Sequence, residues 1–202
     1  MTEQISEQEK KSYLIIGLGN PGREYRGSRH NIGFRVVDHL AEKMGAAFSR
    51  LESKALVAKG EIQGSHLILA KPQTYMNLSG RATGGLLRFY KIPLKNLLVI
   101  YDDVDLPFET LRMRPGGGSA GQKGMQSIIE NLGSPNFPLL RVGVGRPPGQ
   151  MQAADYVLQD FSKAQLEALP FVLERAAEAV FDFVSNGIES AMNKHNAASE
   201  PS

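Results

Sequence analysis

Apolar residues along this chain recur with two periods, that of buried strands and that of amphipathic helices. Short apolar runs predict strands at 13–16, 56–62, 66–70, 96–101, 110–114 and 139–145. Helical spacing predicts helices at 31–44, at 79–90 with Ser79 as a cap, at 125–132, between Ser162 and Gly187, and at 188–195. The turn Gln63-Gly64-Ser65 predicts a hairpin, which makes the sheet mixed. The alternation predicts an α/β fold: a single domain with a twisted mixed β-sheet and helices packed on both faces.

The two ends of the chain fall outside this pattern. Residues 1–11 and 197–202 are mostly polar, so we expect flexible tails on either side of one folded domain at 12–196. The N-terminal segment lacks the apolar centre of a secretory signal, and no apolar run approaches membrane-spanning length. We therefore expect a cytoplasmic protein with no membrane partner.

Composition removes several kinds of chemistry. The chain has 202 residues, 42% of them hydrophobic, which is enough for one sizeable core. It contains no cysteine, which excludes disulfides, thiolate catalysis and cysteine zinc sites. Its four histidines, at 30, 39, 66 and 195, have no ligand spacing with one another. We expect neither a metal nor a cofactor.

The basic residues are concentrated in two segments, although the net charge is only +2. Residues 23–35 carry four arginines and one acid, Glu24, and residues 112–146 carry four arginines and one lysine against Glu130 alone. A solvated basic face explains this distribution as well as a binding surface does. The glycine-rich loop 115–124 lies within the second segment and precedes a predicted helix, which is typical of an anion site.

The segment 14–31, LIIGLGNPGREYRGSRHN, places several polar groups directly after the first predicted strand. Its glycines match the G-x-G-x-x-G pattern of dinucleotide-binding proteins, with Asp38 at about the distance of the ribose-binding acid. However, Pro21 precedes the third glycine, an arginine-rich loop precedes the helix, and Asp38 falls inside that helix. The segment therefore favours a turn that presents Asn20 over a nicotinamide site.

Further polar residues follow other predicted strands, at the edge where open α/β sheets place their sites. Asn20 and His30 follow the first strand, Asn77 follows the hairpin, and Asp102 follows the strand 96–101. A histidine held by a carboxylate can activate water, and amide N–H groups can hold a carbonyl or oxyanion. No serine stands in a nucleophile elbow, which favours direct attack by water. Structural alternatives remain for each residue: a capping histidine, turn-forming asparagines, and a solvated aspartate turn or magnesium site.

Four sequence blocks occur together here in a fixed order: GLGNPGREYRGSRHNIGF, KPQTYMNLSG, YDDVDLP and the glycine loop that begins at Gly116. From Tyr13 to about His195 they resemble the bacterial-type peptidyl-tRNA hydrolases. The resemblance implies a monomeric enzyme that uses water activated by histidine, without a metal. It would cleave the ester between a peptide, or an N-blocked aminoacyl group, and the 3′ end of tRNA. This reaction recycles stalled peptidyl-tRNA during translation.

The resemblance also assigns roles to residues. It implies that His30 is the catalytic base and that Asp102 orients it. The substrate-binding residues that it implies are Asn20, Tyr25, Met76, Asn77 and Lys123, with the two asparagines near the scissile ester and Met76 beside the peptide. Arg114 and Arg141 fall where the family clamps the terminal phosphate of tRNA, a task for which bidentate guanidinium groups are well suited.

Lys123 is the main departure from the family pattern. The family usually has asparagine at this position, often histidine where Gln122 stands, and commonly lysine where Gln126 stands. A lysine can donate to the same carbonyl or to a phosphate, but it lacks the acceptor half of the amide. A non-catalytic RNA-binding relative of the same fold, similar to the plant-organelle splicing factors, is therefore the alternative function.

Overall fold

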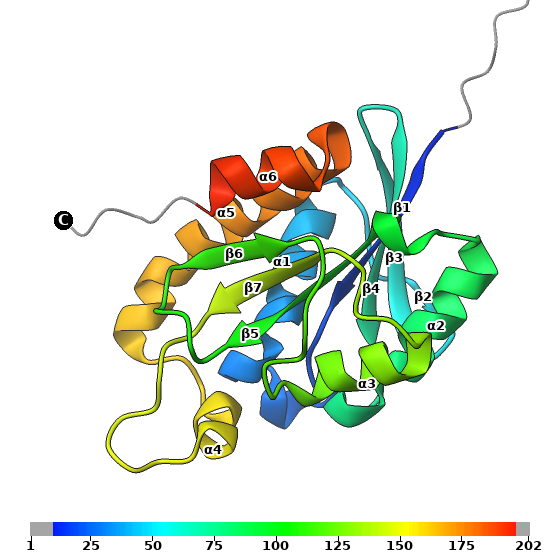
Figure 1. The fold of residues 1–202 in the computed structure, drawn as a ribbon. Coiled ribbons are helices and arrows are strands. Elements are labelled where there is room, and N and C mark those ends of the chain that lie inside the picture. The colour runs from blue at the N-terminus through cyan, green and yellow to red at the C-terminus, as the bar shows by residue number, and fades with distance from the viewer. Residues whose placement is uncertain (1–9, 197–202) are drawn as a thin grey trace, which may run out of the picture.

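The centre of the molecule is a seven-stranded sheet in the order β2-β3-β4-β1-β5-β7-β6 (Figure 1). It is seen in a computed structural model that describes residues 10–196. The strands are β1 (Ser12–Gly17), β2 (Arg50–Glu52), β3 (Ala55–Ile62), β4 (Ser65–Pro72), β5 (Leu97–Asp103), β6 (Leu111–Arg114) and β7 (Leu139–Gly143). Strands β4, β1, β5 and β7 are parallel, and the pairs β2–β3, β3–β4 and β6–β7 are antiparallel. The sheet is mixed, as predicted.

Helices cover both faces of this sheet (Figure 1). The α-helices are α1 (Ile32–Lys43), α2 (Ser79–Tyr90), α3 (Lys123–Leu132), α4 (Ala153–Leu158), α5 (Lys163–Asn186) and α6 (Ile188–His195). Short 3-10 helices are η1 (Arg23–Tyr25), η2 (Arg29–Asn31), η3 (Met76–Leu78) and η4 (Leu94–Asn96). Residues of α1, α5 and α6 pack in one core cluster, and residues of α2 and α3 pack in the other. The predicted single-domain α/β fold is confirmed.

Strand β1 lies between the two core clusters, which explains why its sequence is apolar throughout. Leu14 and Ile16 belong to the cluster under α2 and α3, whereas Ile15 belongs to the cluster under α1 and α5. All three side chains are fully buried. A parallel strand with helices on both faces must be apolar at every position, because each face enters a core.

Two glycines allow the start of α1 to approach the sheet closely. A Cβ atom at Gly33 would lie 2.4 Å from the carbonyl oxygen of Ile100, and one at Gly17 would lie 2.2 Å from the carbonyl oxygen of Gly33. Contacts this short leave no room for a side chain. The residues just before α1, including His30, are thereby brought against the end of β5.

Several predicted element boundaries were wrong. Ser79 does not cap α2: Leu78 is the capping residue, and the buried Ser79 hydroxyl donates to the Met76 carbonyl at 2.7 Å. The helix follows directly from η3, and the backbone N–H of Gly80 in its first turn donates to the Ser127 hydroxyl of α3 at 2.9 Å. Helix α3 begins at Lys123 instead of residue 125, because the Gln122 side chain caps it. Strand β7 ends two residues earlier than predicted, at Gly143.

The hairpin β3–β4 forms as predicted, with Gln63 and Gly64 both at positive φ and Ile62 paired with Ser65. Strand β2 and helix α4 were not predicted at all. Residues 1–9 and 197–202, which make up most of the predicted tails, lie outside the described residues. Within the described part of the chain, no helix has the length and apolar content needed to span a bilayer.

Candidate active site

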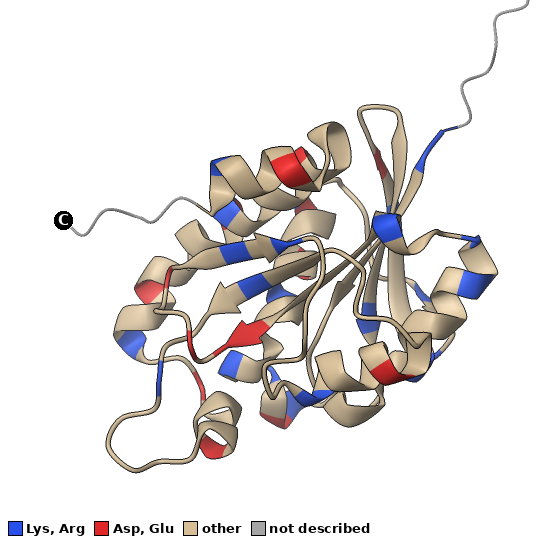
Figure 2. Ribbon diagram, viewed as in Figure 1, with Lys and Arg blue, Asp and Glu red and all other residues tan. Residues whose placement is uncertain are grey.

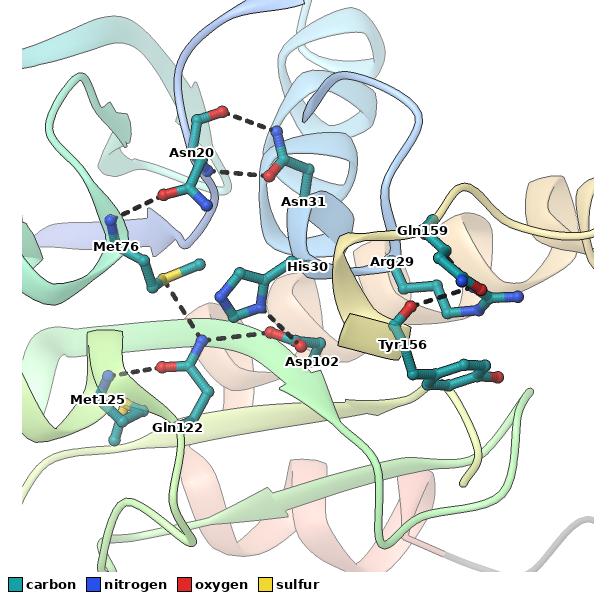
Figure 3. A network of polar contacts seen from close by, with 10 residues as sticks. All are labelled: Asn20, Arg29, His30, Asn31, Met76, Asp102, Gln122, Met125, Tyr156 and Gln159. Carbon is teal, nitrogen blue, oxygen red and sulfur yellow. Dashed lines mark hydrogen bonds and ion pairs between the residues drawn. The ribbon is translucent and has the colours of Figure 1, made fainter. Parts of the chain in front are cut away.

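Asn20 is presented by the turn that follows β1 (Figure 3). Its backbone N–H donates to Oδ1 of Asn31 at 2.9 Å, and Nδ2 of Asn31 donates back to its carbonyl at 2.9 Å. The Asn20 side chain is then free to reach across to the next loop, where Oδ1 accepts from the backbone N–H of Met76 at 2.8 Å. Two loops that are far apart in sequence are thus joined, and the NH2 end of Asn20 remains for a ligand.

His30 and Asp102 form the central pair of the site (Figure 3). Nδ1 of His30, in η2, lies 2.8 Å from Oδ2 of Asp102, near the end of β5. The His30 side chain is 14% exposed and that of Asp102 is 3% exposed. Because an ionised carboxylate only accepts hydrogen bonds, Nδ1 carries the hydrogen and Nε2 keeps a free lone pair. The pair therefore presents a base to solvent from a buried anchor.

Gln122 holds the other oxygen of Asp102, a role that sequence reasoning missed. Its Nε2 donates to Oδ1 of Asp102 at 3.2 Å and lies 3.4 Å from the sulfur of Met76. Its Oε1 accepts from the backbone N–H of Met125 at 2.8 Å and so caps α3. Glutamine is not among the preferred N-cap residues, and no local signal in the sequence indicates its contact with β5.

A cavity of about 520 Å³, here called the catalytic cavity, opens beside these groups. The predicted residues that line it are Asn20, His30, Met76, Asn77, Asp102 and Lys123. Tyr75, Gln122 and residues of α4 complete its wall. Tyr25 does not line it; this half-buried residue lies in η1, where its backbone bonds to Gly22 and Ser28. The structure therefore brings together six of the nine predicted residues, which come from the β1–α1 connection, η3, the end of β5 and the start of α3.

The two predicted phosphate-binding arginines lie on the neighbouring strands β6 and β7. Arg141 pairs in register with Arg112 on β6 and with Tyr101 on β5, and exposed Arg114 follows at the end of β6. Since side chains alternate along a strand, the three arginines share one face. Figure 2 shows these basic strand positions next to the acidic end of β5.

Arg141 is held in place by β5. Its Nε donates to the Tyr101 hydroxyl at 3.2 Å, and its Nη1 lies 3.8 Å from Oδ2 of Asp103. Burial raises the pKa of Tyr101, and the nearby Arg141 only partly opposes this shift. The hydroxyl therefore stays protonated at neutral pH, and the guanidinium keeps its charge available on its open side.

Helix α4 is anchored to the catalytic segment by Arg29, the residue before His30. Nη1 of Arg29 donates to the carbonyls of Tyr156 at 3.2 Å and Gln159 at 3.3 Å, and its guanidinium lies 4.0 Å from the centre of the Tyr156 ring (Figure 3). Arg29 is only 6% exposed. The adjacent Ser28 forms a β-bridge with Asp160. Sequence reasoning missed α4 because it is short and its anchor lies far away in the chain.

The aspartates after β5 do not converge on one point. Asp102 binds His30 and Gln122, Asp103 accepts from the backbone N–H of Asp105 at 2.8 Å, and Asp105 pairs with Arg146 at 3.0 Å. Among residues 10–196, no cluster of three histidines and carboxylates could hold a metal ion. Asp102 and Asp103 are buried and Asp105 is exposed, so this segment is not a solvated turn.

Comparison with known proteins decides the family. A family model described as peptidyl-tRNA hydrolase matches residues 14–202. The chain belongs to this family. The match and the relatives below confirm the hydrolase activity on peptidyl-tRNA that the sequence blocks predicted.

The similarity extends over almost the whole chain. The sequence is 53% identical to the peptidyl-tRNA hydrolase of Chloroflexus aggregans over 185 residues, which are 91% of this chain and 98% of the relative. It is 52% identical to the chloroplastic peptidyl-tRNA hydrolase of Arabidopsis thaliana over 169 residues, which are 83% of this chain and 59% of that protein. The crystal structure of the peptidyl-tRNA hydrolase from Acinetobacter baumannii superposes with a TM-score of 0.86 at 33% identity, covering 92% of this chain and 94% of the other.

Proposed function

We propose that this peptidyl-tRNA hydrolase cleaves its ester substrate by water that His30 activates, without a metal. The observation that carries the proposal is the 2.8 Å bond between Nδ1 of His30 and buried Asp102, at the wall of the catalytic cavity. Asp102 fixes the tautomer in which Nε2 can accept a proton, and its charge stabilises the imidazolium that forms. With His30 as the base, the reaction needs neither a serine nucleophile nor a metal-bound water.

Hydrolysis of the ester takes two steps. A water oxygen attacks the ester carbonyl carbon while Nε2 of His30 takes one of the water protons. The tetrahedral intermediate then collapses, the bond to the ribose oxygen breaks, and that oxygen takes the proton from Nε2. The products are the free 3′ end of tRNA and a peptide carboxylic acid, which releases the second water proton to solvent and becomes a carboxylate.

Asn20 and Asn77 are proposed to hold the substrate during this reaction. The Asn20 oxygen is occupied by the Met76 N–H, so its NH2 group is the end that can donate to a carbonyl or oxyanion. Asn77 is exposed at the rim of the same cavity, next to buried Met76. Lys123, at the start of α3, adds a cation that can donate to the same carbonyl or to a phosphate. Tyr25 lies outside this cavity, and its substrate-binding role has no geometric support.

Arg114 and Arg141 are proposed to bind a tRNA phosphate on the open face of β6 and β7. Arg114 is exposed and Arg141 is held in place by Tyr101, so both guanidinium groups can bind the same tRNA phosphate. The complete His30–Asp102 pair favours catalysis over the RNA-binding alternative. We further propose that the enzyme acts as a monomer in the cytoplasm; its relatives include a chloroplastic form as well as bacterial proteins.

The test is hydrolysis of an N-blocked aminoacyl-tRNA and of the free aminoacyl-tRNA, each with EDTA present. We expect cleavage of the blocked substrate only. His30→Ala should lower kcat by about 10² to 10⁴, the usual contribution of a general base, with an unchanged circular dichroism spectrum. His66→Ala, at a partly exposed histidine that does not line the cavity, is the matched control. Turnover of His30→Ala close to that of the control would remove His30 from the mechanism.

A further inference from the structure

A second cavity of about 520 Å³ adjoins the catalytic cavity, and the two share Asn20. It lies between the start of α1 and the paired residues Leu56 and Lys71 of β3 and β4. The loop that follows β4 borders both cavities, since Gln73 lines the second cavity and Met76 lines the first. A molecule bound at the catalytic pair can therefore extend past Asn20 into this second space.

The second cavity is strongly basic. Its charged lining residues are Arg23, Arg26, Arg35, Asp38 and Lys71. Lys71 and Asp38 neutralise each other, with Nζ of the lysine 2.6 Å from Oδ1 of the aspartate. Within residues 10–196, none of the three arginines has a carboxylate within ion-pair distance. We call this space the arginine cavity.

Arg35 is the most restrained of the three arginines. Its Nη2 donates to the Arg26 carbonyl at 3.4 Å, a long bond, and its buried Nε has no hydrogen-bond partner among the described residues. The buried Nε itself cannot contact a ligand, but a carboxylate in the cavity would be attracted by the charge of the whole guanidinium group. Phe34 and Leu56 add apolar surface to the same wall. The lining therefore suits a ligand that carries both anionic and apolar groups.

The strand order shows which part of the substrate faces this cavity. The proposed phosphate-binding arginines lie on β7 and β6, the catalytic pair lies at β5, and the arginine cavity lies beyond β1, at β4 and β3. The tRNA and the peptide are joined only at the ester, so they leave the catalytic pair in different directions. With tRNA over β7 and β6, the peptide extends toward β4 and β3. An extended peptide covers about 3.5 Å per residue, so its second or third residue from the ester reaches past Asn20.

We propose that the arginine cavity binds the peptide part of peptidyl-tRNA and favours peptides with an aspartate or glutamate two or three residues from the ester. This inference rests on the proposed function and on the tRNA contacts of Arg114 and Arg141. Guanidinium groups bind carboxylates bidentately, and the surrounding apolar wall accommodates the neighbouring side chains of the peptide. A peptide that carries both acidic and apolar side chains matches this lining better than a phosphate group alone does.

The test compares two N-acetyl-tripeptidyl-tRNAs that differ only by glutamate or glutamine at the third residue from the ester. We expect kcat/KM to be about two- to fivefold higher for glutamate, as for a partly exposed charge pair, mainly through KM. In the double variant Arg23→Gln/Arg26→Gln this ratio should fall to about one. The control Arg50→Gln/Lys95→Gln removes the same charge at exposed positions outside both cavities and should keep the ratio.

Three other results are informative. Equal rates for both peptides with the unmodified enzyme would overturn the inference. So would an equal slowing of N-acetylaminoacyl-tRNA and tripeptidyl-tRNA in the Arg23→Gln/Arg26→Gln variant, because the cavity would then contact tRNA. If neither peptide is cleaved, the proposed function itself fails, whereas turnover without charge preference removes only the assignment of this cavity.

Discussion

Asp102 shows how two distant residues can fix one carboxylate. His30 binds one of its oxygens and Gln122 the other, and Gln122 also caps α3 through its own oxygen. The carboxylate cannot rotate without breaking at least one of these two bonds. The imidazole is therefore held by an anchor that has a single favourable orientation.

A change of Gln122 to glutamate tests this arrangement through pH dependence. The substitution keeps the size of the side chain and its capping oxygen but places a second negative charge next to Asp102. A negative charge near the imidazole favours its protonated form, so the acid limb of kcat/KM should move to higher pH by about one unit or more. A pH–rate profile of Gln122→Glu measures this shift.

Gln126→Glu is the control for this substitution, because residue 126 is exposed one turn further along the same helix. Its acid limb should stay within a few tenths of a pH unit of the unmodified enzyme. If both variants shift the limb equally, the contact between Gln122 and Asp102 has no special role.

The sequence predicted most single residues of the site but not the contacts between them. His30, Asp102, Asn20 and Asn77 were found because each follows a predicted strand, and that strand edge is where they meet. Gln122 was noted only as a departure from the family, since its bond to Asp102 depends on how the glycine loop packs against β5. Such a contact has no periodicity that could reveal it.

At the scale of elements, long apolar elements were predicted well and short ones were missed. Strand β2 has an exposed Arg50 and an exposed Leu51, so it carries no burial pattern and exists through its pairing with β3. Helix α4 is six residues long, too short for a helical period to be recognised. Both elements owe their structure to partners elsewhere in the chain.

Helix α4 should therefore depend on Arg29 more than on its own sequence. Arg29→Lys keeps the charge but removes the forked hydrogen bonds to the Tyr156 and Gln159 carbonyls and the stacking on the Tyr156 ring. We expect the local opening free energy of α4 to fall by about 3 kcal/mol or more, since each of the two charge-assisted hydrogen bonds contributes about 1.5 to 3 kcal/mol. Because α4 lines the catalytic cavity, KM should also rise.

Amide hydrogen exchange at Tyr156 and Val157 measures this local opening. Arg175→Lys is the control, since Arg175 also donates to a backbone carbonyl, that of Glu109, but lies away from α4. Exchange in α4 that is equally slow in both variants would show that the helix is held by other contacts.

At the scale of the whole molecule, charge is arranged along the ends of the strands. The net charge of +2 is small, but part of each basic segment gathers on one side of the acidic end of β5 (Figure 2). Three arginines of the first segment line the arginine cavity beside β4, and three arginines of the second share one face of β6 and β7. Their positions could not be predicted from charge counts, because they follow from the register of β6 against β7 and from the approach of α1 to β4. One group is proposed for the tRNA and the other for the peptide.

The salt dependence of tRNA binding tests the first of these groups. In a His30→Ala background, which slows turnover by about 10² to 10⁴, Arg114→Gln should weaken binding of N-blocked aminoacyl-tRNA and reduce the slope of log Kd against log salt. The slope should fall by about 0.7 to 0.9 for each phosphate that the variant no longer binds, because fewer counterions are released. Titrations between low and moderate salt provide the slope.

Arg114 is the cleaner position for this measurement, since it is exposed, whereas Arg141 also binds Tyr101 and neighbours Asp103. Removal of Arg141 would leave a carboxylate without its nearby cation and so change the local field in a second way. Arg50→Gln, at the opposite edge of the sheet, provides a control with the same change in charge and should keep the original slope. A slope in Arg114→Gln equal to that of this control would mean that the phosphate is bound elsewhere on the molecule.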